Sequence, residues 1–157
     1  MDQVQKLIGV SGHLTAIQRK GPSAPLNLFL KNKIFFKRAS ILDYGCGHGA
    51  DVRALKELGF NVTGYDPYWA PIENISPSDI ITCTYVFNVL LPAERERTLE
   101  KIKKLLRPNG QALITVRRDF SRDYASKNGQ QFRVVLDLPS IFKLKGKFET
   151  YLLKQGP

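Results

Sequence analysis

A glycine-rich stretch and a later acid are the residues of this chain best suited to bind a ligand. Residues 40–49 read Ser-Ile-Leu-Asp-Tyr-Gly-Cys-Gly-His-Gly, and Asp66 follows roughly 20 positions after the first glycine. Glycines let a ligand approach the backbone with no Cβ in the way, and they allow the positive φ of a tight turn. A carboxylate at this spacing can accept hydrogen bonds from ribose hydroxyls. The pattern therefore predicts a site for a nucleotide-like cofactor.

A strand, a loop, a helix and a second strand must position these residues. Ile41 and Leu42 begin an apolar run that is typical of a buried strand. Residues 51–58 carry an amphipathic helical pattern, and residues 61–65 read as a strand that ends at the acid. The helix start adds free N–H groups and the positive end of the helix dipole.

The glycine pattern by itself leaves two classes of cofactor open. Gly45, Gly47 and Ala50 satisfy the dinucleotide fingerprint G-x-G-x-x-G/A, which would suit a nicotinamide cofactor. With Asp43 before the glycines and Gly49 after them, the stretch also reads Asp-x-Gly-x-Gly-x-Gly. In this form it resembles the cofactor loop of class I S-adenosylmethionine-dependent methyltransferases, whose product is S-adenosylhomocysteine.

The resemblance implies a set of cofactor-binding residues. In that family the loop passes the methionine part of the cofactor, and an acid that closes the second strand takes the ribose hydroxyls. By resemblance, the ribose role falls on Asp66. The predicted cofactor-binding residues are Asp43, Gly45, Cys46, Gly47, Gly49, Asp66, Pro67 and Thr84.

A narrower resemblance covers most of residues 13–110. Thr15-Ala16-Ile17 followed by Arg19, and then Ser23-x-Pro25, look like a subgroup of methyltransferases associated with DNA phosphorothioation loci. Residues 64–68 and 85–89 are similar to the same subgroup. Similarity to this subgroup supports the prediction of S-adenosylmethionine as the cofactor better than it supports the prediction of any particular substrate.

Polar residues follow the predicted strand at residues 79–84, and open α/β sheets bind their ligands at such strand ends. Tyr85 and Asn88 are therefore the predicted catalytic residues. Asn88 can orient a nucleophile by hydrogen bonding, although capping of the following turn explains it equally well. Many exocyclic-amine methyltransferases of nucleic acid carry Asn/Asp-Pro-Pro-Tyr/Phe at this point, and this chain does not.

Three further residues are predicted to contact the substrate: Arg19, Tyr68 and Arg118. Arg19 can pair with a cofactor carboxylate or a phosphate, although surface charge explains it as well. Tyr68 and Trp69 are candidate stacking surfaces for adenine or for a base being methylated, but a clamp on the core explains Trp69 more simply. Arg118 is expected to border the substrate opening.

Length and composition indicate one domain with a substantial core, since the chain has 157 residues and is 43% apolar. The two cysteines, Cys46 and Cys83, show no C-x-x-C spacing, so neither a zinc site nor a redox pair is predicted. Cys83 lies in an apolar run and is expected in the core. No run approaches the roughly 18 apolar residues of a membrane span, and no signal segment is recognisable. These features predict a cytoplasmic protein with no metal and no membrane partner.

The net charge of +10 is concentrated at the two ends of the chain. Residues 1–40 hold seven Lys or Arg against one acid, residues 117–157 hold nine against four, and the middle is nearly neutral. Basic flanks beside a neutral cofactor domain suit a polyanion, and nucleic acid is the predicted partner. Solubilising charge explains the flanks equally well. Nothing in the sequence indicates an oligomeric state.

The other elements follow from periodicity and turn residues. Residues 67–78 contain three prolines and have no room for the helix and third strand of a full class I sheet. The pattern predicts helices at 25–36 and 92–107, a strand at 111–116, and paired strands at 132–138 and 148–153. Residues 119–129 read as a loop or short helix, and residues 1–21 as a short helix or an ordered arm.

Together these features predict a compact Rossmann-like, three-layer α/β/α methyltransferase fold. Its mostly parallel sheet is trimmed between strands 2 and 4 and ends in an antiparallel hairpin. In this single domain, residues 1–39 form an arm and helix, residues 40–117 the cofactor core, and residues 118–157 the C-terminal strands.

The predicted function is methyl transfer from S-adenosylmethionine to RNA or DNA. The alternatives are a small-molecule methyltransferase and a non-catalytic cofactor-binding module, such as a regulatory subunit of a nucleic-acid enzyme. A nicotinamide oxidoreductase comes last, because no hydride-transfer site can be located.

Overall fold

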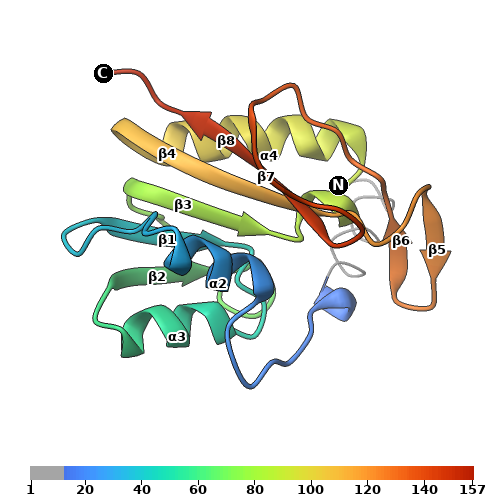
Figure 1. The fold of residues 1–157 in the computed structure, drawn as a ribbon, viewed down its shortest axis with the longest axis horizontal. Helices are drawn as coiled ribbons and strands as arrows, with labels where there is room; N and C mark the ends of the chain where they lie inside the picture. Colours follow the sequence, from blue (N-terminus) through green and yellow to red (C-terminus); the bar gives the residue numbers. More distant parts are fainter. Residues whose placement is uncertain (1–12) are drawn as a thin grey trace.

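The computed structural model describes residues 13–157, which build a six-stranded sheet in the order β2-β1-β3-β4-β8-β7 (Figure 1). The first four strands in that order run parallel, whereas β8 is antiparallel to β4 and β7 is antiparallel to β8. The predicted mostly parallel sheet with a closing hairpin is confirmed. The strands of the sheet are β1 (Ser40–Tyr44), β2 (Asn61–Tyr65), β3 (Ser78–Thr84), β4 (Leu106–Arg117), β7 (Ser140–Leu144) and β8 (Phe148–Lys154).

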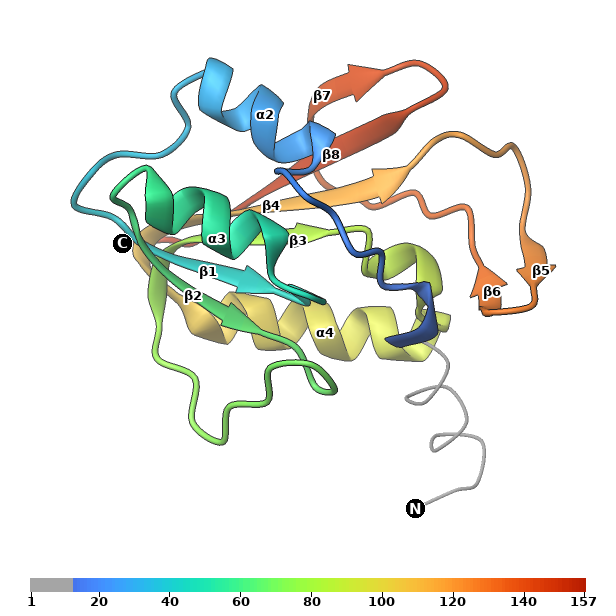
Figure 2. The same cartoon turned by 90° about the horizontal axis from the view of Figure 1, so that it is seen from below.

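Helices cover the two faces of the sheet and make three layers (Figure 2). The helices α2 (Ala24–Lys31) and α3 (Ala50–Glu57) lie on one face, and α4 (Pro92–Leu105) lies on the other. Successive strand residues point to opposite faces, so Ile41 packs in the core under α2 and α3 while Leu42 packs under α4. Each fully buried side chain of this size stabilises the fold by about 1.5–3 kcal/mol.

Capping residues set where the helices begin and end. Ser23 caps α2, since its hydroxyl accepts a hydrogen bond from the Leu26 N–H, and a proline occupies the first turn. The helix stops at Lys31 rather than at residue 36 as predicted, because Asn32 is its C-cap and Lys33 takes a left-handed φ of 55°. Helix α4 begins at the predicted proline and ends two residues earlier than expected.

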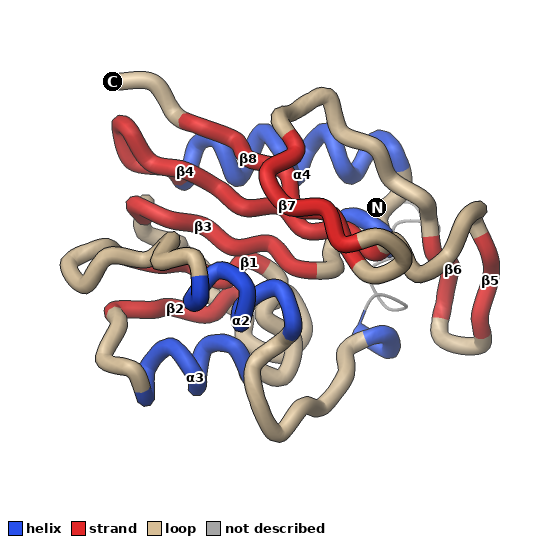
Figure 3. Tube along the Cα trace, in the orientation of Figure 1, coloured by secondary structure: helices blue, strands red, loops and turns tan. Residues whose placement is uncertain are grey.

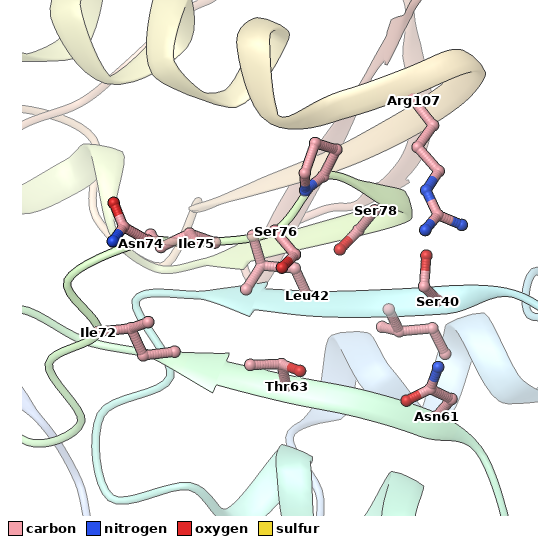
Figure 4. Close-up of a pocket in the computed structure, with 12 residues that line it drawn as sticks. Ser40, Leu42, Asn61, Thr63, Ile72, Asn74, Ile75, Ser76, Ser78 and Arg107 are labelled. Carbon is pink, nitrogen blue, oxygen red and sulfur yellow. The ribbon is translucent and has the colours of Figure 1, made fainter.

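The predicted trimming of the sheet lies between β2 and β3. Residues 66–77 form neither a helix nor a strand, and β2 is therefore an edge strand. This segment and the β1–β2 face border a cavity of about 370 Å³, which Leu42, Thr63 and Ile72 line (Figure 4). None of its lining residues belongs to the predicted site.

The C-terminal part differs from the prediction at residues 132–138, which do not form a strand. The alternating Phe132, Val134, Leu136 and Leu138 pack against the core on the α4 side instead of pairing with β8. Strand β8 pairs antiparallel with β4 on one side and with β7 on the other. The segment predicted as a loop or short helix contains a small hairpin, β5 (Tyr124–Ser126) and β6 (Gly129–Gln131), beside the main sheet (Figure 3).

The predicted arm at residues 1–21 lies partly outside the described residues. Its described part includes η1 (His13–Thr15) and an extended segment that crosses the carboxyl ends of the strands (Figure 2). A further short helix, η2 (Phe87–Val89), follows β3. Within residues 13–157, no helix has the length and apolar character needed to cross a bilayer.

Candidate active site

A cavity of about 760 Å³ opens at the carboxyl ends of β1, β2 and β3. Its walls come from the glycine loop, the segment after β2, the segment after β3, part of α4, the turn between β7 and β8, and residues 15–19. All eight predicted cofactor-binding residues line it: Asp43, Gly45, Cys46, Gly47, Gly49, Asp66, Pro67 and Thr84. The structure therefore brings the predicted cofactor-binding residues together around a single cavity.

The glycine loop needs glycine most strictly at Gly45. Its φ is 83°, and an added Cβ would lie 2.4 Å from Cγ2 of Val86. The N–H groups of Gly45 and Cys46 both donate to the Tyr65 carbonyl, which fixes the loop to the end of β2. A side chain at Gly45 would therefore push the loop away from Val86 and from the Tyr65 carbonyl at the end of β2.

Asp66 organises the backbone around the cavity. Its Oδ2 accepts a hydrogen bond from the Gly47 N–H at 3.0 Å, and its Oδ1 accepts from the N–H groups of Tyr68 and Trp69. A carboxylate can accept about four hydrogen bonds, so Asp66 has capacity for a ligand hydroxyl. The predicted ribose-binding acid is thus also the residue that ties the glycine loop to the segment after β2.

Asp43 is a buried acid below the loop, with 4% of its surface exposed. The Thr82 hydroxyl donates to its Oδ1 at 3.0 Å. Burial, with repulsion from Asp51 and Asp66, raises the pKa of Asp43 to about 7, although the Thr82 hydrogen bond opposes the shift. The cavity floor therefore gathers three carboxylates, one of which titrates near neutral pH.

This pKa predicts a pH-dependent stability. Between about pH 4 and pH 7 the folded chain retains a proton on Asp43 that the unfolded chain has lost, so stability falls as pH rises through this window. This rise in the pKa of Asp43 corresponds to a loss of up to about 4 kcal/mol of folding free energy above pH 7. Asp43→Asn should remove this term, so urea unfolding should show the variant gaining stability over the wild type from pH 5 to pH 8. Parallel pH profiles for the two proteins would contradict the assignment.

Neither cysteine is a nucleophile. Burial, together with the Asp43 and Asp66 carboxylates, raises the pKa of the Cys46 thiol to about 12. Cys83 is fully buried, and burial also raises its pKa. Both thiols therefore stay protonated, and Cys83 is a core residue as predicted.

The end of the cavity beyond β3 carries Tyr85 and Arg19. Tyr85 has a left-handed φ of 60°, which is uncommon for a bulky residue, and its N–H donates to the Thr115 carbonyl. The Arg19 guanidinium lies 5.8 Å from the centre of the Tyr85 ring. Burial raises the pKa of the Tyr85 hydroxyl while Arg19 opposes that shift, so the hydroxyl is neutral at pH 7.

Asn88 also lines the cavity, but its amide is partly committed to the fold. Its Nδ2 donates to Oε1 of Gln131 at 2.9 Å, and its backbone carbonyl accepts from the Phe132 N–H. Asn88 thus joins η2 to the end of the β5–β6 hairpin. Gln131 is a cavity residue that sequence reasoning missed, because the two amides are 43 positions apart.

The structure does not bring Arg118 into the cavity. Its guanidinium is buried and pairs with Glu149, with Nη2 2.9 Å from Oε1, and it also donates to Tyr151 and to the Val134 carbonyl. Its neighbour Arg117 lines the cavity instead and makes an ion pair with Asp119. The prediction of Arg118 as a substrate-binding residue is therefore replaced by a structural role.

Aromatic side chains stand at the rim near Asp66. Tyr68 lines the cavity and is half exposed, whereas Trp69 packs against the His48 ring with centroids 4.1 Å apart. Trp69 keeps 43% of its surface exposed, which is more than a clamp on the core would leave. Lys147, in the turn before β8, is a further cavity residue that the sequence did not single out.

Residues 16–145 match a family described as a methyltransferase domain. The chain belongs to this methyltransferase domain family. The match contains the glycine loop, Asp66 and the segment after β3. No curated protein matches the chain.

Solved structures share this methyltransferase fold at low sequence identity. The PH0226 protein from Pyrococcus horikoshii OT3 is 12% identical, with a TM-score of 0.63 and 100% of both chains covered. The 1,6-didemethyltoxoflavin-N1-methyltransferase of Burkholderia thailandensis, solved with 1,6-didemethyltoxoflavin and S-adenosylhomocysteine, is 16% identical, with a TM-score of 0.59, covering 99% of this chain and 83% of that one.

A third structure concerns the conversion of a disulfide bond into a thioacetal group during echinomycin biosynthesis. It is 19% identical with a TM-score of 0.52, and the match covers 60% of this chain and 48% of that one, so the methyltransferase domain described here spans about half of its length. The prediction of an S-adenosylmethionine-dependent methyltransferase is confirmed at the level of family and fold.

Proposed function

We propose that the 760 Å³ cavity binds S-adenosylmethionine beside the glycine loop and that the chain transfers the methyl group to a nucleic acid. The observation that carries this proposal is the uneven charge of the cavity. Asp43, Asp51 and Asp66 line the cavity in and around the glycine loop, whereas Arg19, Arg117 and Lys147 line it from other segments, which also contribute Glu94, Lys101 and Asp119. A cationic cofactor and an anionic acceptor would each meet charge of the opposite sign.

The residues at the loop end fit this cofactor. The loop leaves no room for a Cβ at Gly45, and Asp66 retains the capacity to accept a hydrogen bond from a ribose hydroxyl. When bound, S-adenosylmethionine supplies a methyl group activated by its sulfonium. The chain has to hold an acceptor atom in line with that methyl group and to exclude water.

The far end supports a polyanionic acceptor. Arg117 is paired with Asp119, but no ion pair involving Arg19 or Lys147 occurs within residues 13–157. The segment around β5 and β6 adds the exposed cations Arg122 and Lys127, which lie in the chain between the cavity residues Asp119 and Gln131. Positive charge bordering a pocket is suited to phosphates.

The basic residues before β1 lie away from the cavity. Lys31 ends α2, and Lys33, Lys37 and Arg38 follow it before the start of β1, at the end of the sheet away from the cavity. This N-terminal basic cluster therefore does not border the pocket. The proposal depends on the cations near the cavity and on the exposed rings of Tyr68, Trp69 and Tyr124, which offer stacking surfaces for bases.

The chain also resembles the phosphorothioation-associated subgroup at residues near the cavity. Among the residues that resemble the phosphorothioation-associated subgroup, Arg19 and residues 65–68 line the cavity, which supports placing the chain near that subgroup. A small-molecule acceptor is the second candidate. It is favoured by the segment at residues 15–19, which lines the cavity, and by structural neighbours such as the 1,6-didemethyltoxoflavin-N1-methyltransferase.

Asp66→Ala should lower the affinity for S-adenosylmethionine by about 10- to 100-fold, because it removes a ribose partner and the acceptor for three backbone N–H groups. Asp66→Asn, which keeps one carbonyl acceptor, should lose less. Isothermal titration calorimetry measures both, with the exposed Asp137→Ala as the matched control. Wild-type affinity in Asp66→Ala would remove this acid from the site.

Binding to tRNA and duplex DNA should weaken steeply as salt rises, because each phosphate contact releases a counterion. Filter binding across a salt series measures the slope, and neutralising Arg122 or Lys127 should reduce it by about one each. Lys33→Gln, in the N-terminal basic cluster, is the control and should leave the slope unchanged. A flat salt response of the wild type would exclude nucleic acid as the acceptor and favour a small molecule.

A further inference from the structure

An exposed surface opposite the cavity combines cations with two apolar side chains. It lies at the amino ends of the strands, where the turn before β1 meets the end of α3 (Figure 2). Phe36 keeps 56% of its surface exposed, and Leu58 keeps 49%. We call this surface the amino-end patch, and its residues are Lys31, Lys33, Phe36, Lys37, Arg38, Lys56 and Leu58. None of them lines the cavity.

The fold holds Phe36 in solvent by burying its neighbour. Phe35 is 8% exposed and packs against the rings of Phe29 and Phe60, with centroids 6.4 Å and 5.8 Å away. A turn follows, closed by a hydrogen bond from the Ala39 N–H to the Phe36 carbonyl. The backbone of Phe36 is therefore fixed at the surface, so contact with a partner would cost little conformational entropy.

Lys37 joins this turn to the end of α3. Its Nζ donates a hydrogen bond to the Leu58 carbonyl and lies 4.2 Å from the centre of the Phe60 ring. The contact brings Phe36 and Leu58 to neighbouring parts of the surface. The patch therefore has an apolar centre that belongs to two separate segments of the chain.

The cations around this centre have no acidic partners. Within residues 13–157, no ion pair includes any of the five, which are Lys31, Lys33, Lys37, Arg38 and Lys56. Glu57 is an exposed acid beside Lys56 in the chain, so the patch keeps a clear excess of positive charge. A partner that complements the patch is anionic and has an apolar region.

We propose that the amino-end patch binds the surface of an anionic lipid bilayer, with Phe36 and Leu58 entering the boundary between headgroups and acyl chains. An anionic leaflet attracts lysine and arginine side chains near its surface. Apolar side chains that stand among such cations are buried at the acyl boundary. A nucleic-acid backbone would also attract the cations, but the aliphatic Leu58 cannot stack on a base.

This inference goes beyond the proposed function and does not depend on it. A bilayer bound at the amino ends of the strands would leave the cavity, at their carboxyl ends, open to its ligands (Figure 2). The prediction of no membrane partner came from the lack of a spanning segment in the sequence, and a peripheral surface needs none.

Vesicle sedimentation tests the proposal with the full chain. The protein should sediment with vesicles of phosphatidylcholine that contain about 30% phosphatidylserine, and not with phosphatidylcholine alone. Lys33→Gln and Arg38→Gln should each lower the partition coefficient about fivefold. Phe36→Ser should lower it about five- to tenfold, because it removes the apolar contact.

Two matched controls separate the patch from the net charge of the chain. Arg97→Gln removes an exposed cation from α4, and Val135→Ser removes an apolar side chain that is 72% exposed elsewhere on the surface. Both should leave the partition coefficient unchanged. All of these variants replace exposed side chains, and thermal unfolding shows that each one folds.

Fluorescence reports which end of the molecule meets the bilayer. The wild-type chain has a single tryptophan, Trp69, at the rim of the cavity, so its emission should not change with vesicles. Phe36→Trp adds a reporter within the patch, and its emission should move to shorter wavelength as the ring leaves water.

Several results would overturn the inference. The first is no sedimentation with phosphatidylserine vesicles, and the second is equal losses in the patch variants and the two controls. A shift of Trp69 emission would place the cavity end at the bilayer, and a reduced salt slope of tRNA binding in Lys33→Gln would assign the patch to nucleic acid. Calorimetric titration of Phe36→Ser with S-adenosylmethionine should match the wild type, so failure of the cofactor proposal would be seen separately.

Discussion

Gly45→Ala is expected to destabilise the protein by about 2–5 kcal/mol and to reduce S-adenosylmethionine affinity at least about tenfold. Two costs add at this position. A left-handed φ of 83° costs a non-glycine residue about 1–2 kcal/mol, and an added Cβ 2.4 Å from Cγ2 of Val86 forces repacking worth about 1–3 kcal/mol. The loop must then move away from the cofactor cavity. Urea unfolding measures the first effect and calorimetric titration the second.

Two further variants separate the backbone cost from the steric cost. Gly59 has a φ of 84°, lies outside the cavity, and its added Cβ would make only an ordinary contact with Lys37. Gly59→Ala should therefore show the backbone cost alone and leave cofactor affinity intact. Val86→Ala in the Gly45→Ala background removes the clashing methyl group and should restore part of the loss. Equal effects of the Gly45 and Gly59 variants on affinity would contradict the loop assignment.

Arg118→Met is expected to cost about 3–5 kcal/mol of stability, because it leaves the buried carboxylate of Glu149 without its cation. For a chain of this size that lowers Tm by about 6–20 °C. Burial alone would raise the pKa of Glu149, but hydrogen bonds from Ser140 and Arg118 lower it. Without Arg118 the carboxyl is more easily protonated, so the loss should be smaller at pH 4 than at pH 8.

Thermal unfolding at both pH values checks the expectation for Arg118. The exposed Arg122→Met is the matched control and should change stability by no more than about 0.5 kcal/mol. Combining Arg118→Met with Glu149→Gln removes both charges and should recover part of the loss. Because Arg118 lies outside the cavity, S-adenosylmethionine affinity in the folded variant should stay near the wild-type value. A stability loss as small as that of Arg122→Met would show that the buried ion pair contributes little to the free energy of unfolding.

The cofactor half of the site could be predicted from sequence because its determinants are local. Residues 40–66 carry strand periodicity, turn glycines, a helix and an acid in one continuous stretch, and the structure starts β1, α3 and β2 within one residue of the expected positions. Prolines in the segment after Asp66 correctly indicated the missing helix and strand. Each of these signals needs only near neighbours in the chain.

Residues whose roles depend on distant partners were the ones that sequence reasoning missed. Arg118 is fixed by Glu149, 31 positions away, and nothing local distinguishes it from Arg117, which faces the cavity. The alternation at residues 132–138 is typical of a strand, but the same period suits an extended segment laid on the core. Which of the two forms depends on whether a neighbouring strand is available, and β7 takes that place beside β8.

The measurement that tests the central claim most directly is calorimetric titration of the protein with S-adenosylmethionine, S-adenosylhomocysteine and NAD in parallel. The proposed function predicts micromolar binding of the first two and no binding of NAD, because the chain belongs to a methyltransferase domain family. Binding of NAD in place of the other two, or of none of the three, would contradict an S-adenosylmethionine site in this cavity.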